Sequence, residues 1–467
     1  MRPNSKNNFL TFSVVLFAIF VFCNVKAGAS DNENLIADAV KKMQLNKNTA
    51  LVILYPEGSL TNIKPVAEAF TKQTGVKISF QQTTVDDINT KMMLGAAQDI
   101  SDYDIALPAT FGIPDLVEAG ALYDLSNFAA KYEPLIGYKP SLYALGDNYK
   151  GKKYGYQTDG DTYVMFYNKA WLESDKEEER FHKKYNRPLS IPKNWQELDE
   201  LMAFFHRPEE NKYGGCMFRT PRYMVWEWWI RFHANGAYPV DDNLQPNIAK
   251  EAGIKALEAM ISATKHQHPS ATTNGLFENW KQYGKGNCFA NIGWGGSQKY
   301  FNSDKSQIKN KMVHTPTPGV SYFNWGWNYV LSKHTKHPEL AYLFTLFATT
   351  NETSSMAVRK DGFFDPFRMQ HYSDHTIKKV YTVSFLKAHK QTMTNAIPDF
   401  YLQGQGRYIQ ALQEAILSAH EGYVTAKEAL EYAASQWNDI TQEIGRESQI
   451  EQWGKLKQKY PRSFNRH

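Results

Sequence analysis

The sequence is poor in cysteine, lacks a strong excess of charge of either sign, and contains only one long apolar run. Its 467 residues include three cysteines, 53 basic and 48 acidic residues, which gives a formal net charge of +5. This near balance argues against nucleic-acid binding, which normally shows as a strong basic excess. With 42% hydrophobic and 22% charged residues, the chain is expected to be globular, with two or three domains' worth of core, and not a membrane bundle.

The single apolar run, residues 9–23, predicts a secretory signal peptide over residues 1–29. Arg2 and Lys6 precede the run, and an A-x-A-like sequence of small residues follows it. A membrane anchor is the alternative, but a spanning helix needs about 20 apolar residues. Lipid anchoring at Cys23 is disfavoured because a bulky phenylalanine precedes that cysteine. We therefore expect an exported, periplasmic protein.

Two cysteines remain beyond this leader, Cys216 and Cys288, and each stands at the start of an apparent strand. In an exported protein they can pair if neighbouring strands bring them together. They can equally be two buried free thiols, and the sequence leaves both possibilities open.

Sequence patterns typical of enzymes and of calcium loops are missing. No G-x-S-x-G or H-E-x-x-H run occurs. Asp159 and Asp161 in "GYQTDGDTYVMFYNKAWL" lie on one strand edge and cannot flank a scissile glycosidic bond. A calcium loop beginning at Asp159 fails after its third position. Gly160 between them predicts a bend, and we expect no enzyme activity, no metal and no cofactor.

Aromatic residues are plentiful, at 14% of the chain with 11 tryptophans and 27 tyrosines. Several tryptophans fall in short clusters instead of along a helical stripe. Such clusters are typical of surfaces that grip the faces of sugars or other flat ligands.

Strands and helices alternate at short spacing, which predicts an α/β fold with parallel sheets covered by helices. A glycine stop at Gly75 ends the first predicted helix, and Asn194 caps a later one. Ligands of such sheets bind beyond the carboxyl ends of the strands, where Glu57 and Thr110 lie. The first elements are strands at 49–60, 76–83 and 103–110 and helices at 62–75 and 85–98.

The order of motifs along the chain resembles that of the extracellular solute-binding proteins of ABC importers, in the sugar-binding group that includes maltose- and oligosaccharide-binding proteins. No single motif is specific, but their order is, and together they cover nearly all of the chain after the leader. The motifs are "LVILYPEGSLTNIKPVAEAFTKQTGVKISF", "YDIALPATFGIPDLVEAGALYDLS", "GKKYGYQTDGDTYVMFYNKAWL", "IPKNWQELDELMAFF" (with Asn194 where Thr is usual), "GKGNCFANIGWGGSQ", "NYVLSKHTKHPELAYLFTLFAT" and "GFFDPFR".

The resemblance implies two α/β lobes, each a mostly parallel sheet flanked by helices, joined by three crossing segments around a ligand cleft. One lobe would hold residues 30–160 and a return segment at 327–362. The other would hold residues 161–326 and C-terminal helices at 363–449. The basic residues 450–467 are interpreted as a solvated tail.

The resemblance also implies a set of ligand contacts. Asp161 aligns with a hydroxyl-accepting acid, Trp294 with a stacking tryptophan, and Trp325 lies in a hinge strand. Simpler interpretations are that one aspartate only caps a turn, that Trp294 is a core residue, or that Arg368 pairs across the lobes without touching ligand. The full candidate set is Glu57, Ser59, Thr110, Asp159, Asp161, Arg222, Tyr223, Trp294, Asn324, Trp325, Asp365 and Arg368.

We therefore predict a monomeric periplasmic protein that captures a carbohydrate by lobe closure and delivers it to an ABC permease in the inner membrane. One alternative solute is a polyamine or another polar nitrogenous compound, because "YDIALPATF" also resembles polyamine-binding proteins. Arg222 and Arg368 argue against it, since they would repel a polycation. A second alternative is a periplasmic ligand sensor.

Overall fold

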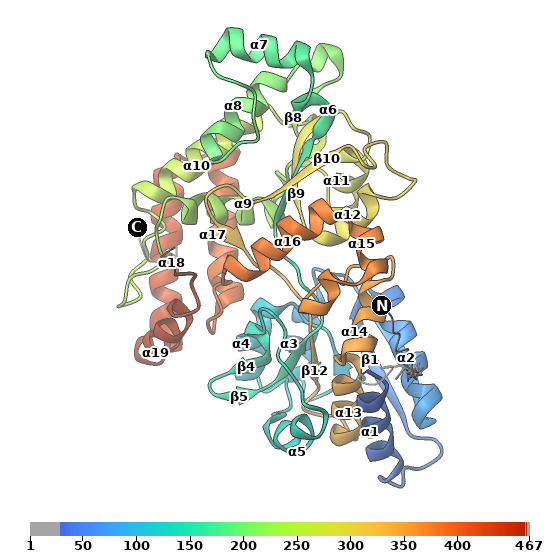
Figure 1. Cartoon of the computed structure of the whole chain (residues 1–467). Coiled ribbons are helices and arrows are strands. Elements are labelled where there is room, and N and C mark those ends of the chain that lie inside the picture. The colour runs from blue at the N-terminus through green and yellow to red at the C-terminus, as the bar shows by residue number, and fades with distance from the viewer. Residues whose placement is uncertain (1–28, 463, 465–467) are drawn as a thin grey trace, which may run out of the picture.

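The computed structural model describes residues 29–462 and 464 and arranges them in two lobes, one above the other in Figure 1. This confirms the predicted two-lobe α/β fold. The charged and apolar regions of the predicted signal peptide lie outside the described residues. Within the described part of the chain, no helix is long and apolar enough to cross a membrane.

The lower lobe is built on a five-stranded sheet of order β2-β1-β3-β12-β6, with helices on its faces (Figure 1). Its strands are β1 (Ala50–Pro56), β2 (Lys77–Thr83), β3 (Ile105–Ala106), β6 (Gly155–Gln157) and β12 (Asn328–Leu331), with a small hairpin of β4 (Asn148–Tyr149) and β5 (Lys152–Lys153). Its helices are α1 (Ala29–Lys41), α2 (Leu60–Thr74), α3 (Ile88–Ala97), α4 (Ile113–Glu118), α5 (Ser126–Ile136), α13 (Pro338–Ala348) and α14 (Asn351–Val358), with short 3-10 turns η1 (Thr110–Gly112) and η2 (Leu145–Asp147).

The upper lobe is built on a four-stranded sheet of order β10-β7-β9-β8. Its strands are β7 (Val164–Asn168), β8 (Tyr213–Gly215), β9 (Cys288–Gly293) and β10 (Met312–Pro316), and β11 (Ser321–Tyr322) pairs with β13 (Ala396–Ile397). Its helices are α6 (Lys169–Leu172), α7 (Asp175–Tyr185), α8 (Trp195–Phe205), α9 (Pro221–Ala234), α10 (Glu251–Thr264), α11 (Leu276–Tyr283), α12 (Gly295–Phe301), α15 (His375–Tyr381), α16 (Val383–Asn395), α17 (Gln405–His420), α18 (Ala426–Ile444) and α19 (Arg446–Lys457), with 3-10 turns η3 (Pro208–Glu210), η4 (Pro269–Thr272) and η5 (Met369–Tyr372).

Two helix boundaries follow the signals read from the sequence. Gly75 ends α2 in the left-handed conformation, with φ of 79°, and its N–H bonds back to the carbonyl of Thr71. Asn194 caps α8, because its side-chain oxygen accepts the N–H of Glu197 at 2.9 Å.

Both sheets are mixed, and the expectation of mostly parallel sheets is wrong. β1 is parallel to β2 and β3, but β12 is antiparallel to β3 and β6. In the upper lobe β7 is antiparallel to β9 and β10, and only β8 and β9 are parallel. The reason is that β7 and β12 each enter their lobe from a crossing segment. They therefore run away from the cleft, whereas strands such as β3 and β9 run toward it.

Three crossing segments join the lobes and contact one another. Thr162 in the first pairs with Phe323 in the second. The first and third meet at Gly160, where a Cβ atom would lie 2.1 Å from the carbonyl oxygen of Pro366. Gly160 is thus needed for this close approach, and its φ is not in the left-handed region. The presence of a glycine at position 160 is therefore explained by this close packing and not by the bend that the sequence predicted.

The interpretation of residues 450–467 as a solvated tail is wrong. Helix α19 extends to Lys457, and apolar side chains from it and beyond pack on the upper lobe. Trp453, Tyr460 and Phe464 are 1%, 4% and 7% exposed, and the Tyr460 hydroxyl lies 3.2 Å from the His233 ring nitrogen Nε2. The large aromatic residues within the basic stretch were the signal for this packing, because such side chains are seldom left fully exposed.

Cys216 and Cys288 form a disulfide, with Cα atoms 5.9 Å apart. Cys288 opens β9 and Cys216 directly follows β8, and these two strands are paired. Of the two possibilities left open by the sequence, the structure shows the bridge.

Candidate ligand-binding site

A cleft between the lobes is walled by aromatic rings. Its empty space, about 390 Å³, includes solvent at the open mouth of the cleft. The rings come from α9, from α11, from the end of β9 and from the second and third crossing segments. We call this cleft the aromatic box. It is lined by Tyr223, Trp280, Trp294, Trp325, Trp327 and Phe363, together with Val85, Asp161, Leu276 and Gly296.

The rings of the box include both parallel and perpendicular pairs. Tyr223 and Trp325 are nearly parallel, at 19° with ring centres 6.3 Å apart. Trp294 stands almost perpendicular to Trp325, at 84° and 6.0 Å. A ligand in the box therefore meets both faces and edges of aromatic rings.

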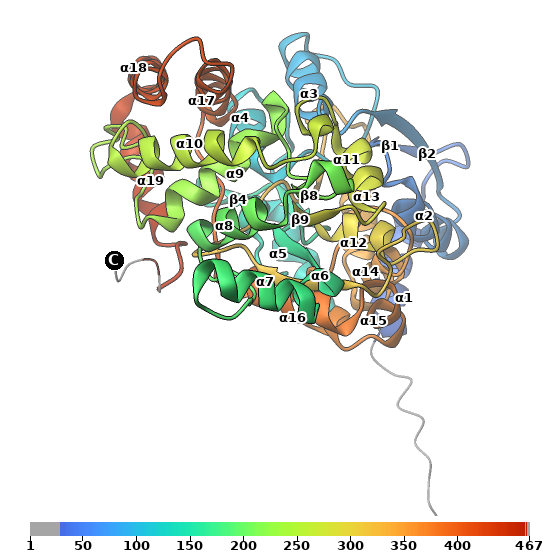
Figure 2. The ribbon, with the colours of Figure 1, turned by 90° about the horizontal axis from the view of Figure 1, so that it is seen from above.

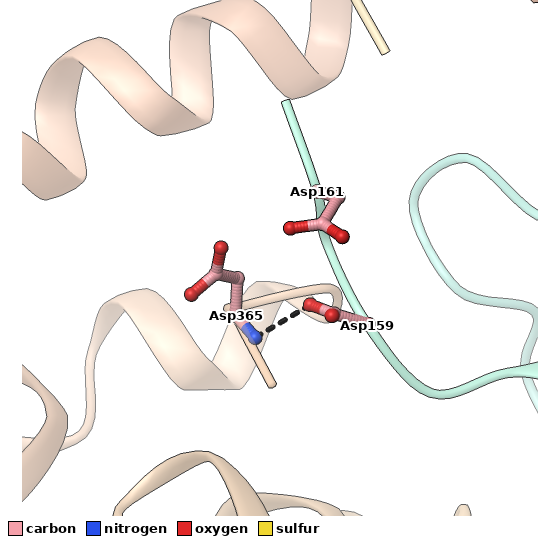
Figure 3. Close-up of side chains that lie close together, drawn as sticks. All are labelled: Asp159, Asp161 and Asp365. Atoms are coloured by element: carbon pink, nitrogen blue, oxygen red, sulfur yellow. Dashed lines mark hydrogen bonds between the residues drawn. The ribbon is translucent and has the colours of Figure 1, made fainter. Parts of the chain in front are cut away.

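Three aspartates gather beside the box, of which Asp161 lines it, and Figure 3 shows how the three side chains lie close together. Asp159 and Asp161 come from the first crossing segment and Asp365 from the third. One carboxylate oxygen from each lies within 4.8 Å of the others. Asp159 Oδ1 accepts the backbone N–H of Asp365 at 2.6 Å. Asp365 lies 206 positions after Asp159 in the sequence, and the crossing segments bring the two side chains together.

Polar groups around Asp365 hold its carboxylate in place. The Tyr381 hydroxyl donates to Oδ1 at 2.6 Å, and the N–H of Gly296 donates to Oδ2 at 3.2 Å. A Cβ atom on Gly295 would lie 2.5 Å from this carboxylate. The glycine pair after Trp294 thus lets Asp365 approach the backbone at the start of α12.

Burial raises the pKa of Asp159 and of Asp161 well above the ordinary carboxyl value, and repulsion from neighbouring carboxylates raises both further. Burial also raises the pKa of Asp365 to about 6, although Lys299 opposes this shift. Among the described residues, Asp159 Oδ2 has no hydrogen-bond partner. At neutral pH these buried carboxyl groups must therefore be protonated in part, or must bind a cation or a hydrogen-bond donor.

Lys299 of α12 is a buried cation that attracts the carboxylates of the cluster. Its ammonium donates to the carbonyl oxygens of Lys360, Gly362 and Phe364 at 2.8, 2.8 and 2.9 Å. Burial lowers the pKa of Lys299 to about 8, against the attraction of Asp365 and Asp159. Lys299 therefore holds the third crossing segment in place, and all three N–H groups of its ammonium donate to backbone carbonyls.

Four of the candidate contacts line the box directly: Asp161, Tyr223, Trp294 and Trp325. Asp159 and Asp365 lie behind Asp161. Two more support the walls from outside. Thr110 donates its N–H to the Trp325 carbonyl at 2.9 Å, and the carbonyl of Asn324 accepts the Trp294 indole N–H at 3.3 Å.

The remaining four candidates do not line the box. Ser59 donates its hydroxyl to the Pro56 carbonyl of its own turn, and Glu57 in the same turn is half-buried. Arg222 pairs with Asp86 at 2.9 Å. Arg368 points to the Lys139 carbonyl at 2.8 Å, because that loop lies beside the third crossing segment.

Sequence reasoning missed several residues of the box, above all Trp280, Trp327 and Phe363. Trp327 stands two residues after Trp325 in the second crossing segment, and the left-handed backbone of Trp325 and Gly326 could not be predicted from the sequence. Phe363 precedes Asp365 in the motif "GFFDPFR". Trp280 lies on the amphipathic α11, where no local pattern separates a wall of a site from a core position.

A wider polar groove adjoins the box and shares Val85 and Trp325 with it. It is open to solvent, with about 1380 Å³ of unfilled space. We call it the outer groove. In Figure 2 α17 lies beside α4, and the Gly404 N–H preceding α17 donates to Asp115 of α4 at 2.5 Å. The polar residues of the groove are Asp86, Asn89, Thr90, Asp115, Arg222, Gln405, Gln410, Gln413 and Glu414.

This architecture, two α/β lobes hinged by crossing segments around an aromatic cleft, defines a class of proteins that enclose a small solute between their lobes. Residues 65–380 match the family described as bacterial extracellular solute-binding protein. The chain belongs to this family, and it is accordingly a solute-binding protein and not an enzyme.

Known relatives and solved structures agree with this assignment. A mannitol-binding protein of Pseudomonas aeruginosa is 26% identical over 269 residues, which are 53% of this chain. The chain spans about three fifths of the length of that relative, 59%.

Three solved structures share the fold at low identity. A solute-binding protein from Agrobacterium vitis S4 with bound D-mannitol has a TM-score of 0.69 and 17% identity, covering 85% of this chain and 99% of that one. Maltose-bound T. maritima MalE3 gives 0.72 and 18%, covering 84% and 100%. A protein from Agrobacterium radiobacter K84 in complex with ribitol gives 0.71 and 15%, covering 84% and 99%.

Proposed function

We propose that this protein captures a carbohydrate, meaning a sugar, an oligosaccharide or a sugar alcohol, by closing its lobes around the aromatic box. The observation that carries the proposal is the position of Asp161, a buried carboxylate at the base of a cleft walled by aromatic rings. Carboxylates accept sugar hydroxyls, and rings stack on the apolar faces of sugars. A relative named for mannitol binding, and neighbours holding mannitol, ribitol and maltose, support the same class of solute.

The proposal extends to the division of the chain and its setting. Residues 30–160 and 327–362 would move as one lobe, and residues 161–326 and 363–449 as the other. The protein would be exported to the periplasm by its signal peptide and act there as a monomer. It would deliver its solute to an ABC permease in the inner membrane.

Thermal unfolding of the exported protein with mannitol, ribitol, maltose and a wider carbohydrate set tests the solute class. A solute that binds only the folded state raises its stability, by about 2.7 kcal/mol at a hundredfold excess over Kd. Trp294→Ala should abolish this stabilisation. Trp171→Ala should retain it, because Trp171 packs on Phe205 away from the box.

Stabilisation by spermidine with none by any carbohydrate would refute the proposal. Delivery is tested separately, by uptake of the stabilising solute in cells that lack the protein. Normal uptake together with a lost cellular response to the solute would identify a sensor in place of a transport component.

A further inference from the structure

The aromatic box has an unusual set of polar groups for a site that would enclose a whole neutral sugar. Among the described residues that line it, Asp161 supplies the only charged group, and no Asn, Gln, Lys or Arg side chain is present. The indole N–H groups of Trp280 and Trp325 have no partner within the described chain. The box thus offers one carboxylate, a few donors and many ring faces.

A neutral polyol would be poorly matched to these groups. Each of its hydroxyls needs partners for a donor and for two acceptor positions. A polar group buried without a partner costs about 1–3 kcal/mol. An ammonium group, by contrast, is attracted both by a carboxylate and by aromatic faces, which contribute about 0.5–2 kcal/mol per contact.

The charges around the box also favour a cation. Asp159, Asp161 and Asp365 are buried together, and Lys299 supplies one positive charge to the three carboxyl groups while its N–H groups are donated to backbone carbonyls. Asp159 Oδ2 remains without a partner among the described residues. A positively charged group beside Asp161 would offset the negative charge of the cluster.

The two arginines that argued against a cationic solute lie outside the box. Arg222 is paired with Asp86 in the outer groove, and Arg368 donates to the Lys139 carbonyl. Neither lines the box. The sequence-based objection to a cation therefore does not apply to this cleft.

The outer groove supplies what the box lacks. Gln405, Gln410 and Gln413 bring side-chain amides to it, and carboxylates lie beside them. The amide of Asn89 is already bonded on both sides to the backbone of Ala109, and that of Gln410 donates to Glu414. Since the groove and the box share Val85 and Trp325, one solute can occupy both. The remaining polar groups of the groove can pair with hydroxyl groups of such a solute.

We propose that the solute carries an ammonium group that occupies the aromatic box against Asp161, while its hydroxyl-bearing part lies in the outer groove. The chemical class is an amino sugar or amino polyol. This inference rests on the proposed capture of a carbohydrate and narrows it to hydroxylated compounds with a cationic nitrogen.

Isothermal titration calorimetry at pH 7 with matched pairs tests the inference. The pairs are D-sorbitol against 1-amino-1-deoxy-D-sorbitol, and D-glucosamine against both D-glucose and N-acetyl-D-glucosamine. In each pair the ammonium compound should bind at least tenfold more tightly. In Asp161→Asn this preference should fall below about threefold, whereas Asp361→Asn, which removes an exposed carboxylate outside the box, should keep it.

The outcomes separate the two proposals. Equal or tighter binding of the neutral partners would overturn the inference and leave the carbohydrate proposal standing. Failure of every hydroxylated compound to bind would overturn both, and so would spermidine binding more tightly than all of them. The wild-type comparison decides even where the Asp161 variant does not fold.

Discussion

Replacing Lys299 by methionine should strongly destabilise the protein, because this buried ammonium holds the third crossing segment. The change removes three hydrogen bonds of 2.8–2.9 Å. A charged hydrogen bond contributes about 1.5–3 kcal/mol, so an upper bound is about 4.5–9 kcal/mol. Two of the three acceptor carbonyls belong to residues that water reaches, so they can bond to water in the variant. The variant also no longer has the cost of burying an ammonium group, and both effects reduce the loss. We expect a net loss of about 3–5 kcal/mol, the usual cost of breaking a buried charged contact.

Urea unfolding followed by tryptophan fluorescence measures this loss. Without the ammonium, the pKa values of the neighbouring aspartates rise further, so the loss should be larger at pH 8 than at pH 5, where the aspartates can take up protons. Lys309→Met is the matched control, because its exposed ion pair with Asp304 should leave the unfolding midpoint unchanged. A Lys299 variant within 1 kcal/mol of the wild type, or with no pH dependence of the difference, would refute the reasoning.

Three further predictions concern the frame around the site. Gly160→Ala should cost about 1–3 kcal/mol or more in urea unfolding, because its Cβ would meet the backbone carbonyl of Pro366; an unchanged midpoint would contradict that close approach. Replacing Cys216 and Cys288 together by serine should lower stability by about 2–4 kcal/mol, and dithiothreitol should reproduce the loss in the wild type but have no effect on the variant. Burial raises the pKa of Asp399 to about 7, so its contribution to stability is complete below about pH 4 and is lost as pH rises through 7. The free energy of unfolding of the wild type, relative to Asp399→Asn, should therefore fall between pH 5 and 8, and parallel pH profiles would refute this.

The fold could be read from the sequence because its signals are local and ordered. Alternating strands and helices, the stop at Gly75 and the cap at Asn194 each depend on neighbours a few residues away. Asp161 and Trp294 differ from these local signals, because their place in the cleft was implied by the resemblance to the solute-binding family and not by their own neighbours.

The features that the sequence did not predict arise where partners are distant along the chain. Arg368 contacts a carbonyl 229 residues away, and Trp280 is set in the wall by packing that its own helix does not reveal. Strand direction was wrong for the same reason, since only the path of the crossing segments decides that β12 runs against β3. The C-terminal residues were interpreted from their charge, whereas the aromatic side chains of Trp453, Tyr460 and Phe464 indicated burial.

The distribution of contacts between lobes suggests an order of events for capture. Of the residues lining the aromatic box, only Val85 and Trp327 belong to the segments assigned to the lower lobe, and Trp327 pairs with Ala109 of that lobe; the rest belong to the upper-lobe segments. Opening the lobes would therefore leave the base and most walls of the box assembled. The ion pair of Arg222 with Asp86 and the bond from Gly404 to Asp115 both join the lobes at the outer groove. A solute can thus bind the box first, and lobe closure then completes the outer groove around its remaining part.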